Sequence, residues 1–130
     1  MQTRKWKLDT DYKYLVEWWK QYDFGTVPKE CLPPDGIVVL LDRPICAAGL
    51  YLCKGTKFGF MEWVVVDKKI GLKTAHNALN LCIEEIIQMA KDNNIKLLYT
   101  VTAQEALQKR YTKYHGMEIG EKSSMTFVKD

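Results

Sequence analysis

The stretch from residue 57 to residue 102 constrains the fold most, because a strand, a long helix and a second strand follow one another there. Lys57–Val66 is β-type, Lys73–Lys91 repeats apolar residues at helical spacing, and Ile95–Thr102 is rich in β-branched and aromatic residues. Two strands joined through a helix lie parallel in one sheet, and the crossover is almost always right-handed. The sequence therefore predicts one parallel strand pair within a larger sheet.

Two further strands precede this stretch, and short connections join them. Gly36–Leu41 and Ile45–Cys53 are runs of β-type residues, followed after a few residues by the strand at residue 57. Short connections of this kind join antiparallel neighbours. The proline-containing segment 27–36 in front of them is predicted as a loop. We therefore expect a mixed sheet, with the antiparallel strands first and the parallel pair after them.

The first residues predict a short strand and a helix. Arg4–Leu8 has strand character, and apolar residues between residues 12 and 22 recur at helical spacing behind a predicted N-cap at Asp9 or Thr10. Trp18 and Trp19 are neighbours on this helix and point about 100° apart. We expect only one of them in the core, with the other lining a cleft or a partner surface.

A last helix and a hairpin complete the predicted order. Thr102–Glu105 reads as a capping box that opens a helix to about Lys113, and Gly116–Gly120 with Met125–Lys129 predicts a hairpin. The predicted fold class is α/β (α+β), in the order β-α-βββ-α-β-α-ββ, with a mixed central sheet of about seven strands and helices on both faces. At 130 residues the chain is expected to form a single domain.

Composition narrows the classes of function. The chain is 47% apolar and 27% charged, which is typical of a folded globular protein, and it has no apolar run near the ~20 residues that span a bilayer. No signal-peptide pattern follows Met1, so we expect a cytoplasmic protein without a membrane partner. The net charge of +3, from 19 basic and 16 acidic residues, is too balanced to indicate a nucleic-acid partner.

The cysteines and histidines form no pattern typical of a metal site. No Cys-x-x-Cys pair occurs, and His76 and His115 do not stand at ligand spacing from a cysteine. Without a secretory signal, the four cysteines are expected as reduced thiols, with Cys82 in helix packing. We therefore expect no metal, a surface position for His76 and a loop position for His115.

Three local features add to this element order. The long strand ends in Val64-Val65-Val66-Asp67 and runs into a long helix, and segment 106–117 (ALQKRYTKYHGM) carries an alanine, a tyrosine and a final glycine before an apolar residue. The third feature is Trp18-Trp19 with the later stretch LPPDG at 32–36. Together these features resemble the GNAT superfamily of N-acetyltransferases over nearly the whole chain, and the third is similar to small GNAT-like proteins of phage genomes.

The resemblance implies acetyl-CoA as a co-substrate, bound in a wedge between two parallel strands that diverge near Val66 and Thr100. In the family, the turn after the first strand of the parallel pair has the sequence Arg/Gln-x-x-Gly-x-Gly/Ala, and its backbone amides bind the pyrophosphate of the coenzyme. The turn here, DKKIGLKTA at 67–75, keeps Gly71 and Ala75. Helix-start amides and nearby lysines suit an anion, although the stretch is also typical of a solvated lysine-rich loop. The residues assigned to the coenzyme by resemblance are Val64, Val65, Val66, Lys69, Gly71, Leu72, Lys73, Thr74, Ala75 and Thr100.

The resemblance also implies direct attack of an amine on the thioester, helped by a base and an acid. Glu62 is the candidate base, because it is expected on the same strand face as Phe60 and Val64, where apolar neighbours raise its pKa. A Glu62 paired with a lysine or arginine, or facing water, is the alternative. Tyr111 matches the tyrosine of the family's last helix and is the candidate acid. Tyr114 is its rival, because the spacing to the final apolar residue is one longer than usual; an ordinary half-buried tyrosine is the alternative for both.

The sequence thus favours an N-acetyltransferase that transfers an acetyl group from acetyl-CoA to a primary amine. The acceptor is a small amine, an N-terminus or a lysine, and no residue pattern identifies which. The alternative is a catalytically inactive GNAT-fold binding protein, such as a phage factor that engages a host protein in the host cytoplasm. The altered turn and spare aromatic surface favour that alternative, and a homodimer is compatible with both.

Overall fold

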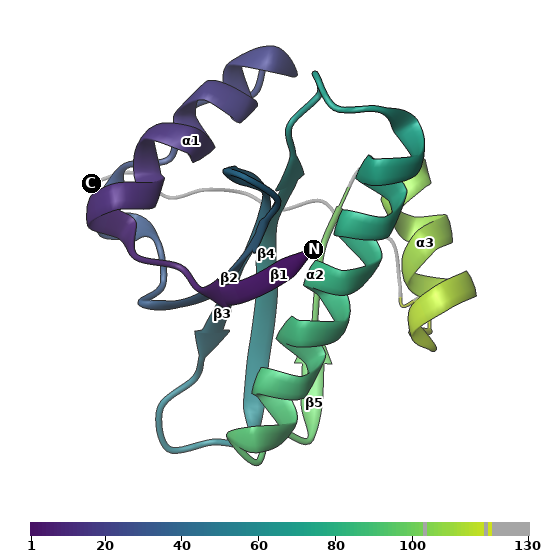
Figure 1. The fold of residues 1–130 in the computed structure, drawn as a ribbon. Coiled ribbons are helices and arrows are strands. Elements are labelled where there is room, and N and C mark those ends of the chain that lie inside the picture. The colour runs from purple at the N-terminus through teal and green to yellow at the C-terminus, as the bar shows by residue number, and fades with distance from the viewer. Residues whose placement is uncertain (103, 119, 121–130) are drawn as a thin grey trace.

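The computed structural model describes residues 1–102, 104–118 and 120, and these form a mixed sheet with helices on both faces (Figure 1). The elements are β1 (Gln2–Lys5), α1 (Leu8–Gln21), the 3-10 helix η1 (Lys29–Cys31), β2 (Asp35–Leu40), β3 (Pro44–Leu52), β4 (Phe58–Val66), α2 (Leu72–Asp92), β5 (Leu97–Tyr99) and α3 (Glu105–His115). The five strands lie side by side in chain order. Neighbouring strands are antiparallel except β4 and β5, which are parallel.

The predicted element order is confirmed from the first strand to the last helix, including the parallel β4–α2–β5 crossover. The described residues form five strands rather than about seven. Gly116 does not open a strand, because it adopts a left-handed conformation (φ 67°) that caps the end of α3. The last predicted strand, Met125–Lys129, lies outside the described residues. Among the described residues, no helix is long and apolar enough to cross a membrane.

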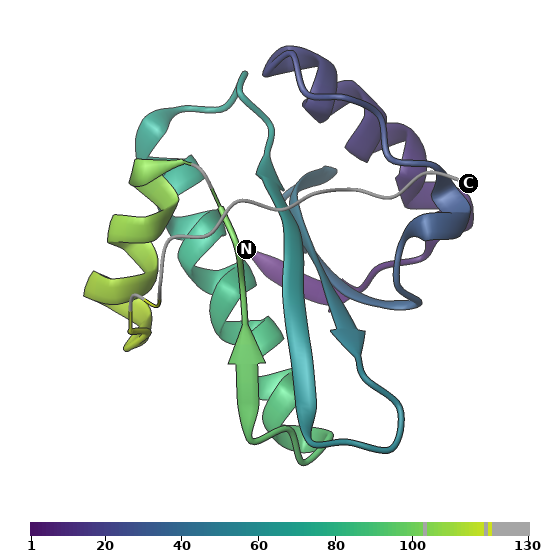
Figure 2. The same cartoon turned by 180° about the vertical axis from the view of Figure 1, so that it is seen from behind.

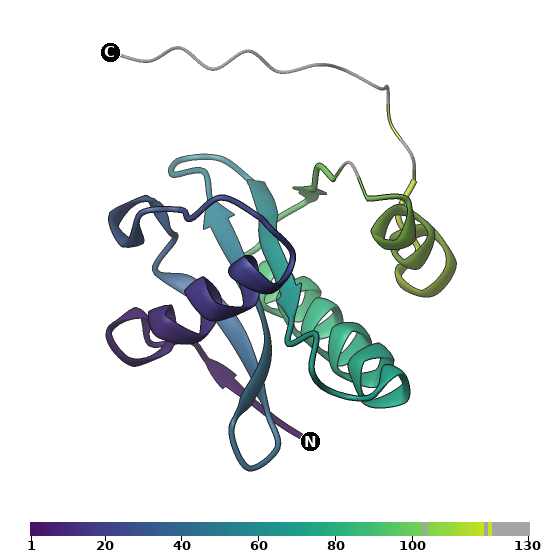
Figure 3. The same ribbon diagram turned by 90° about the horizontal axis from the view of Figure 1, so that it is seen from above.

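Alternating side chains of the sheet supply two cores, one on each face. α1 lies on one face of the sheet and α2 on the other (Figure 3). Because neighbouring residues of a strand point to opposite faces, Val38 packs in the core beneath α1 whereas Val39 packs beneath α2. Cys46 and Cys82, two of the four free thiols, lie in the α2 core, as expected for packing residues. This two-sided burial explains why β2 and β3 are nearly continuous apolar runs.

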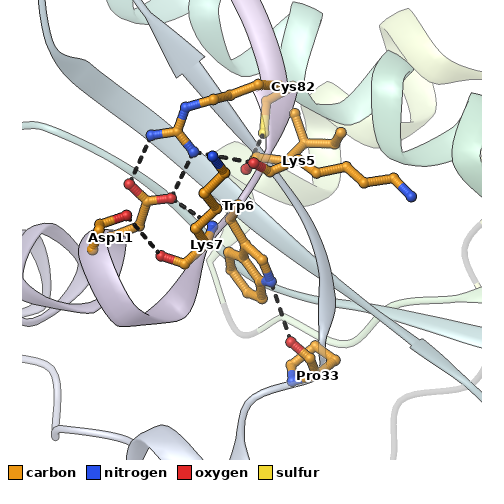
Figure 4. A network of polar contacts seen from close by, with 9 residues as sticks. Lys5, Trp6, Lys7, Asp11, Pro33 and Cys82 are labelled. Carbon is orange, nitrogen blue, oxygen red and sulfur yellow. Dashed lines mark hydrogen bonds and ion pairs between the residues drawn. The ribbon is translucent and has the colours of Figure 1, made fainter.

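The start of α1 differs from the prediction, because neither Asp9 nor Thr10 is its N-cap. Lys7 occupies that position. The amide of Lys7 donates to the carboxylate of Asp11 at 2.7 Å, and the Arg4 guanidinium donates to both carboxylate oxygens at 2.7 and 2.8 Å (Figure 4). Burial alone would raise the pKa of Asp11, but these hydrogen bonds outweigh it and hold the pKa below its usual value. Asp11 thus ties β1 to α1 as an ionised, paired carboxylate.

Trp6 fixes the path of the chain between β1 and α1. Its indole N–H donates to the carbonyl of Pro33 at 3.2 Å (Figure 4). The ring lies so close to the sheet that a Cβ at Gly36 or Gly49 would come within 2.2 or 2.6 Å of it. The proline-containing segment 27–36 therefore packs on the sheet, and it is a loop as predicted except for η1 and the first residues of β2.

Trp18 and Trp19 are both buried, so the prediction that only one of them lies in the core is wrong. Trp18 packs between α1 and the sheet. Trp19 packs in the same cluster, which also includes Val27 of the loop after α1. The carbonyl of Val27 accepts a hydrogen bond from the hydroxyl of Tyr12 at 2.7 Å, which holds the loop against the helix. α1 is therefore covered on two sides, by the sheet and by its own following loop.

Candidate active site

β4 and β5 are paired at one end only. Backbone pairing joins Phe58–Phe60 to Leu97–Tyr99 and stops there. The next contact is made by a side chain, because the hydroxyl of Thr100 donates to the carbonyl of Met61 at 2.8 Å. Beyond that point β4 and the segment after β5 separate (Figure 2). The rest of β4, to Val66, has one edge without a strand partner among the described residues. The divergence is present as predicted and begins earlier along β4.

A cavity of about 760 Å³ opens where the two strands part. This volume lies within the range of about 300–1,000 Å³ that is typical of small-molecule sites. Its walls come from β4, from the residues after β5, from the loop after α1 and from α3. The residues that line it are Trp19, Phe24, Gly25, Thr26, Val27, Glu62, Trp63, Val64, Thr100, Val101, Thr102, Gln104, Leu107 and Tyr111.

A bulge in β4 brings three consecutive residues to this cavity. The register with β3 shifts between Ala47 and Gly49, because two residues of β4 stand opposite one residue of β3 there. Trp63 lies at the bulge with a φ of 63°, a left-handed conformation that is uncommon for a large side chain. In a regular strand, Trp63 would face away from Glu62 and Val64. With the bulge, all three line the cavity.

Contacts on two sides hold Trp63 in this conformation. Its indole N–H donates to the hydroxyl of Tyr51 at 2.8 Å, and that hydroxyl donates to the carbonyl of Cys31 at 2.7 Å. The ring of Trp19 meets it edge-on, with 6.4 Å between centroids. A backbone conformation of this kind costs about 1–3 kcal/mol and persists only where the surroundings fix it. Sequence analysis missed Trp63, because strand alternation places it opposite Glu62 and no glycine or asparagine marks the bulge.

Glu62 lies in the cavity without a lysine or arginine partner in the described part of the chain. Its carboxylate accepts one long hydrogen bond, from the amide of Val101 at 3.4 Å. Burial raises the pKa of Glu62, and this single bond only partly opposes the rise. A half-buried carboxylate with a raised pKa is suited to accept a proton near neutral pH.

Tyr111 lines the same cavity as Glu62, whereas Tyr114 does not. Burial raises the pKa of Tyr111 to about 12, with a smaller opposing effect of a hydrogen bond with Thr100. Tyr114 is 47% exposed, and its ring meets His76 edge-on at 5.3 Å between centroids. The structure therefore brings together Glu62 and the first of the two tyrosines.

A polar network fixes α3 against α2. The Arg110 guanidinium donates to Oδ1 of Asn80 at 2.7 Å and lies 3.2 Å from Nδ1 of His76. At the end of α3, His115 pairs with Glu84, and its side chain is 1% exposed. His115 is therefore a packed helix residue, and the prediction of a loop position is wrong. The network sets the position of the helix that carries the candidate acid.

The start of α3 also differs from the prediction. The N-cap of α3 is Gln104, without a side-chain cap, so the predicted capping box does not form. The hydroxyl of Thr102 instead accepts the amide of Gln104 at 3.1 Å, and the carbonyl of Thr102 accepts the side chain of Gln108 at 2.8 Å. These bonds hold the residues after β5 at the rim of the cavity.

In the turn between β4 and α2, some backbone amides donate to side chains, whereas others have no acceptor within the helix. The amide of Lys68 donates to Oε1 of Gln21 at 2.7 Å, and that of Lys69 donates to Oδ1 of Asp67 at 3.0 Å. α2 has no side-chain cap, so its first four amides lack an acceptor within the helix, whereas Ala75 donates within it. These four amides belong to Gly71, Leu72, Lys73 and Thr74.

The end of α1 reaches over the open end of β4. The hydroxyl of Tyr22 donates to the carbonyl of Val66 at 2.9 Å, and Gln21 donates to the carboxylate of Asp67 at 2.9 Å. A smaller hollow of about 130 Å³ lies here and shares Phe24, Val64, Gln104 and Leu107 with the main cavity. It is lined by all three predicted coenzyme residues of β4, which are Val64, Val65 and Val66.

No family model and no curated protein sequence matches this chain. Solved structures do match it over nearly its full length. A probable acetyltransferase has a TM-score of 0.76 at 16% identity, covering 100% of this chain and 99% of the other. Glucosamine-6-phosphate N-acetyltransferase from Arabidopsis thaliana has a TM-score of 0.70 at 15% identity, covering 98% of each chain. A Mycobacterium tuberculosis protein in complex with CoA has a TM-score of 0.72 at 16% identity, covering 97% of this chain and 76% of the other.

The fold is GNAT-like. This likeness confirms the predicted α+β class, with three helices around the mixed sheet. At these identities the likeness concerns the fold alone, and a fold does not determine a reaction. What this chain does must therefore be argued from the residues of its own cavity.

Proposed function

We propose that this protein is an N-acetyltransferase that transfers an acetyl group from acetyl-CoA to a primary amine by direct attack. One observation carries the proposal. A cavity opens where β4 and β5 part, and a carboxylate with a raised pKa, Glu62, lines it together with a protonated phenol, Tyr111. A base and an acid in one cavity beside an open strand edge are what such a transfer requires.

Acetyl-CoA is proposed to bind along the open edge of β4 and at the start of α2. In this proposal, backbone groups of Val64–Val66 bond the pantetheine arm, and Thr100, just after β5, lies across from them. The free amides at Gly71–Thr74 and the positive end of the helix dipole suit the pyrophosphate. Lys69 and Lys73 add positive charge close to these amides. These residues fit a nucleotide thioester although the turn has fewer glycines than the family pattern.

In the proposed reaction, the amine nitrogen forms a bond to the thioester carbonyl carbon, and the carbon–sulfur bond breaks. The carboxylate of Glu62 accepts a proton from the ammonium, which makes the amine a nucleophile. The hydroxyl of Tyr111 gives its proton to the departing thiolate, and a pKa of about 12 keeps this hydroxyl protonated at neutral pH. As the amide forms, its nitrogen loses a second proton to solvent. Tyr111 regains its proton from Glu62, and the cycle closes.

The unfolding midpoint of the purified protein with acetyl-CoA tests the proposal. Coenzyme at 100 times its dissociation constant adds about 2.7 kcal/mol, which raises the midpoint by several degrees. Lys73→Glu should reduce this rise, because it places a negative charge beside the amides proposed for the pyrophosphate. Lys109→Glu, on the exposed side of α3, is the matched charge-reversal control and should keep it. No rise at millimolar acetyl-CoA would contradict the proposal.

A binding protein without turnover, such as a phage factor that engages a host protein, is the second candidate. The contacts between α1 and the open edge favour it. The hydroxyl of Tyr22 donates to the carbonyl of Val66, and the side-chain oxygen of Gln21 accepts from the amide of Lys68. Part of the proposed coenzyme site is therefore already hydrogen-bonded. A folded protein whose midpoint does not respond to acetyl-CoA would support this candidate over the enzyme.

A further inference from the structure

The cavity beside Glu62 has a composition that restricts the amine it can accept. Of the described residues that line it, Glu62 is the only charged one. Its aromatic wall, as named here, consists of Trp19 of α1, Phe24 of the following loop and Trp63 of β4. Among the described residues, the cavity therefore presents one carboxylate surrounded by neutral, mostly apolar side chains.

This composition disfavours acceptors that carry additional charges. No lysine or arginine lines the cavity in the described part of the chain, so a phosphate on the acceptor would lose water without gaining a counter-charge. A polyamine or an aminoglycoside would pair one ammonium with Glu62, and its other ammonium groups would be buried without a counter-charge. A single ammonium is the charge that this cavity can neutralise.

Two residues of the aromatic wall differ in how they are held: Trp63 is fixed by its neighbours, whereas Phe24 is partly exposed to solvent. Trp63 is held by its hydrogen bond to Tyr51, and its ring lies next to the residue that bears the carboxylate. Phe24 is 41% exposed and stacks on Tyr22 with 5.3 Å between centroids. An ammonium beside aromatic rings gains cation–π attraction, and a ring or alkyl chain attached to it packs on the same wall.

The two sides of the cavity differ in what they offer. Val64, Thr100 and Tyr111 lie where the strands part, on the side proposed for the thioester. Phe24 and Val27 come from the loop after α1, a part of the lining separate from β4 and α3. The aromatic side is thus left for the acceptor.

We propose that the acceptor is a monoamine with an aromatic or aliphatic body, bound with its ammonium at Glu62 and its body against Trp63 and Phe24. The transfer step of this inference rests on the proposed function. Binding of the amine does not, because the aromatic wall and the carboxylate belong to the protein alone. Amine binding and coenzyme binding can therefore be measured separately.

Tryptophan fluorescence tests the inference, because Trp19 and Trp63 line the cavity and report on a ligand there. We would titrate 2-phenylethylamine, spermidine and glucosamine 6-phosphate without coenzyme at about 0.15 M salt. The expected result is that 2-phenylethylamine binds at least about tenfold more tightly than either of the others. 2-Phenylethanol, which lacks the ammonium, should bind more weakly than 2-phenylethylamine.

Two exposed apolar positions provide a matched pair of variants. Phe24→Ala should weaken 2-phenylethylamine binding about tenfold, because it removes the mouth of the aromatic wall. Leu41→Ala removes another exposed apolar side chain, between β2 and β3 and outside the cavity, and should leave binding unchanged. Both positions are on the surface, so neither variant is expected to prevent folding.

Each outcome bears on one proposal or the other. Equal or tighter binding of spermidine or the sugar phosphate, or binding that ignores Phe24→Ala, would overturn the inference about the acceptor. If acetyl-CoA raises the midpoint while no monoamine binds, the transferase proposal stands and the acceptor inference fails. If the monoamine binds as expected while acetyl-CoA has no effect, the ligand class stands and the transferase proposal fails.

Discussion

The two edges of β4 differ in how completely they are paired. Toward β3, pairing runs from the Cys46/Val66 pair to the Leu52/Gly59 pair, with one bulge. Toward β5, pairing covers three residues and stops. Unpaired backbone groups are costly when they are buried, so an interior strand is normally paired on both sides. Among the described residues, the open half of β4 has no strand partner on this edge, and only side chains such as Thr100 and Tyr22 bond its carbonyls.

The carboxylates on the two sides show the same contrast. Asp11, which ties α1 to β1 in the antiparallel part of the fold, is 2% exposed and carries a bidentate bond from Arg4, and its pKa lies below the usual value despite its burial. Glu62, at the open edge, has no such partner in the described residues, and burial raises its pKa. The carboxylate that ties β1 to α1 has a cationic partner, whereas Glu62 in the cavity has none among the described residues.

The largest effect is expected from Glu62→Gln. The amide cannot accept the ammonium proton, so kcat should fall about 10²–10⁴-fold, measured as release of free thiol at saturating acetyl-CoA and amine. The rise of the midpoint with acetyl-CoA should persist, because the coenzyme site is unchanged. Stability should not fall, because a buried carboxylate without a cation is replaced by a neutral group. An unchanged kcat would show that Glu62 is not the base.

The pH dependence of the rate follows from the same residue. Only the ionised Glu62 accepts a proton, so the rate should fall as pH drops through its pKa. Because this pKa is raised, the acid limb should lie above the ordinary glutamate value of about 4.3. A rate profile of the wild-type protein measures the limb, and its loss in the small residual activity of Glu62→Gln assigns it.

Asp11→Ala should affect stability and leave the chemistry intact. Removing the carboxylate leaves the part-buried Arg4 without its partner, and we expect a loss of about 3 kcal/mol in the free energy of unfolding. The rate per folded molecule should not change. Asp9→Ala is the control, because Asp9 pairs with Lys29 at the surface, with a 93% exposed side chain, and should have no measurable effect.

Acid provides a second measurement of the Asp11 contribution. Its folded pKa is lowered, so the stabilisation is present above the unfolded pKa and is lost as pH falls through the folded pKa. Denaturant unfolding of the wild-type protein should therefore show a steeper loss of stability in acid than Asp11→Ala does. Parallel curves for the two proteins would show that Asp11 does not carry this contribution.

The helices and strands away from the cavity were predictable from sequence, because local patterns specify them. Alternation and short connections gave β2, β3 and β4, and the long apolar period gave α2 with its parallel crossover. The cap of α1 was missed, because Asp11 reaches back to Lys7 only when Arg4 holds it, and that contact spans seven residues. Such a cap depends on where β1 lies, which the helix sequence alone does not specify.

The open side was predictable in outline only. Glu62 and Tyr111, predicted from strand alternation and from a family resemblance, both line one cavity, and their roles stay predictions. Trp63 was not found, because its left-handed backbone is imposed by Tyr51 and Trp19, which contact it only in the folded protein. Conformations held by tertiary contacts leave no local sign in the sequence.

Tyr111→Phe should have a smaller effect than Glu62→Gln. A thiol has a pKa near 8.5, so a thiolate leaves fairly well without an acid, and we expect kcat to fall about tenfold. Tyr114→Phe distinguishes the two tyrosines, because it removes a hydroxyl that does not line the cavity, and should leave kcat unchanged. A larger loss in Tyr114→Phe than in Tyr111→Phe would reverse the assignment.

Tyr22→Phe should have the smallest effect and tests the open edge itself. The change removes the hydroxyl that occupies the carbonyl of Val66, at a cost of about 1 kcal/mol or less in stability. If acetyl-CoA uses this carbonyl, its dissociation constant should fall about fivefold, because the coenzyme no longer displaces an internal hydrogen bond. Tyr12→Phe removes a comparable bond, to the carbonyl of Val27, from the same helix and should leave the constant unchanged. Equal affinities in all three proteins would mean that the coenzyme does not compete with α1 for β4.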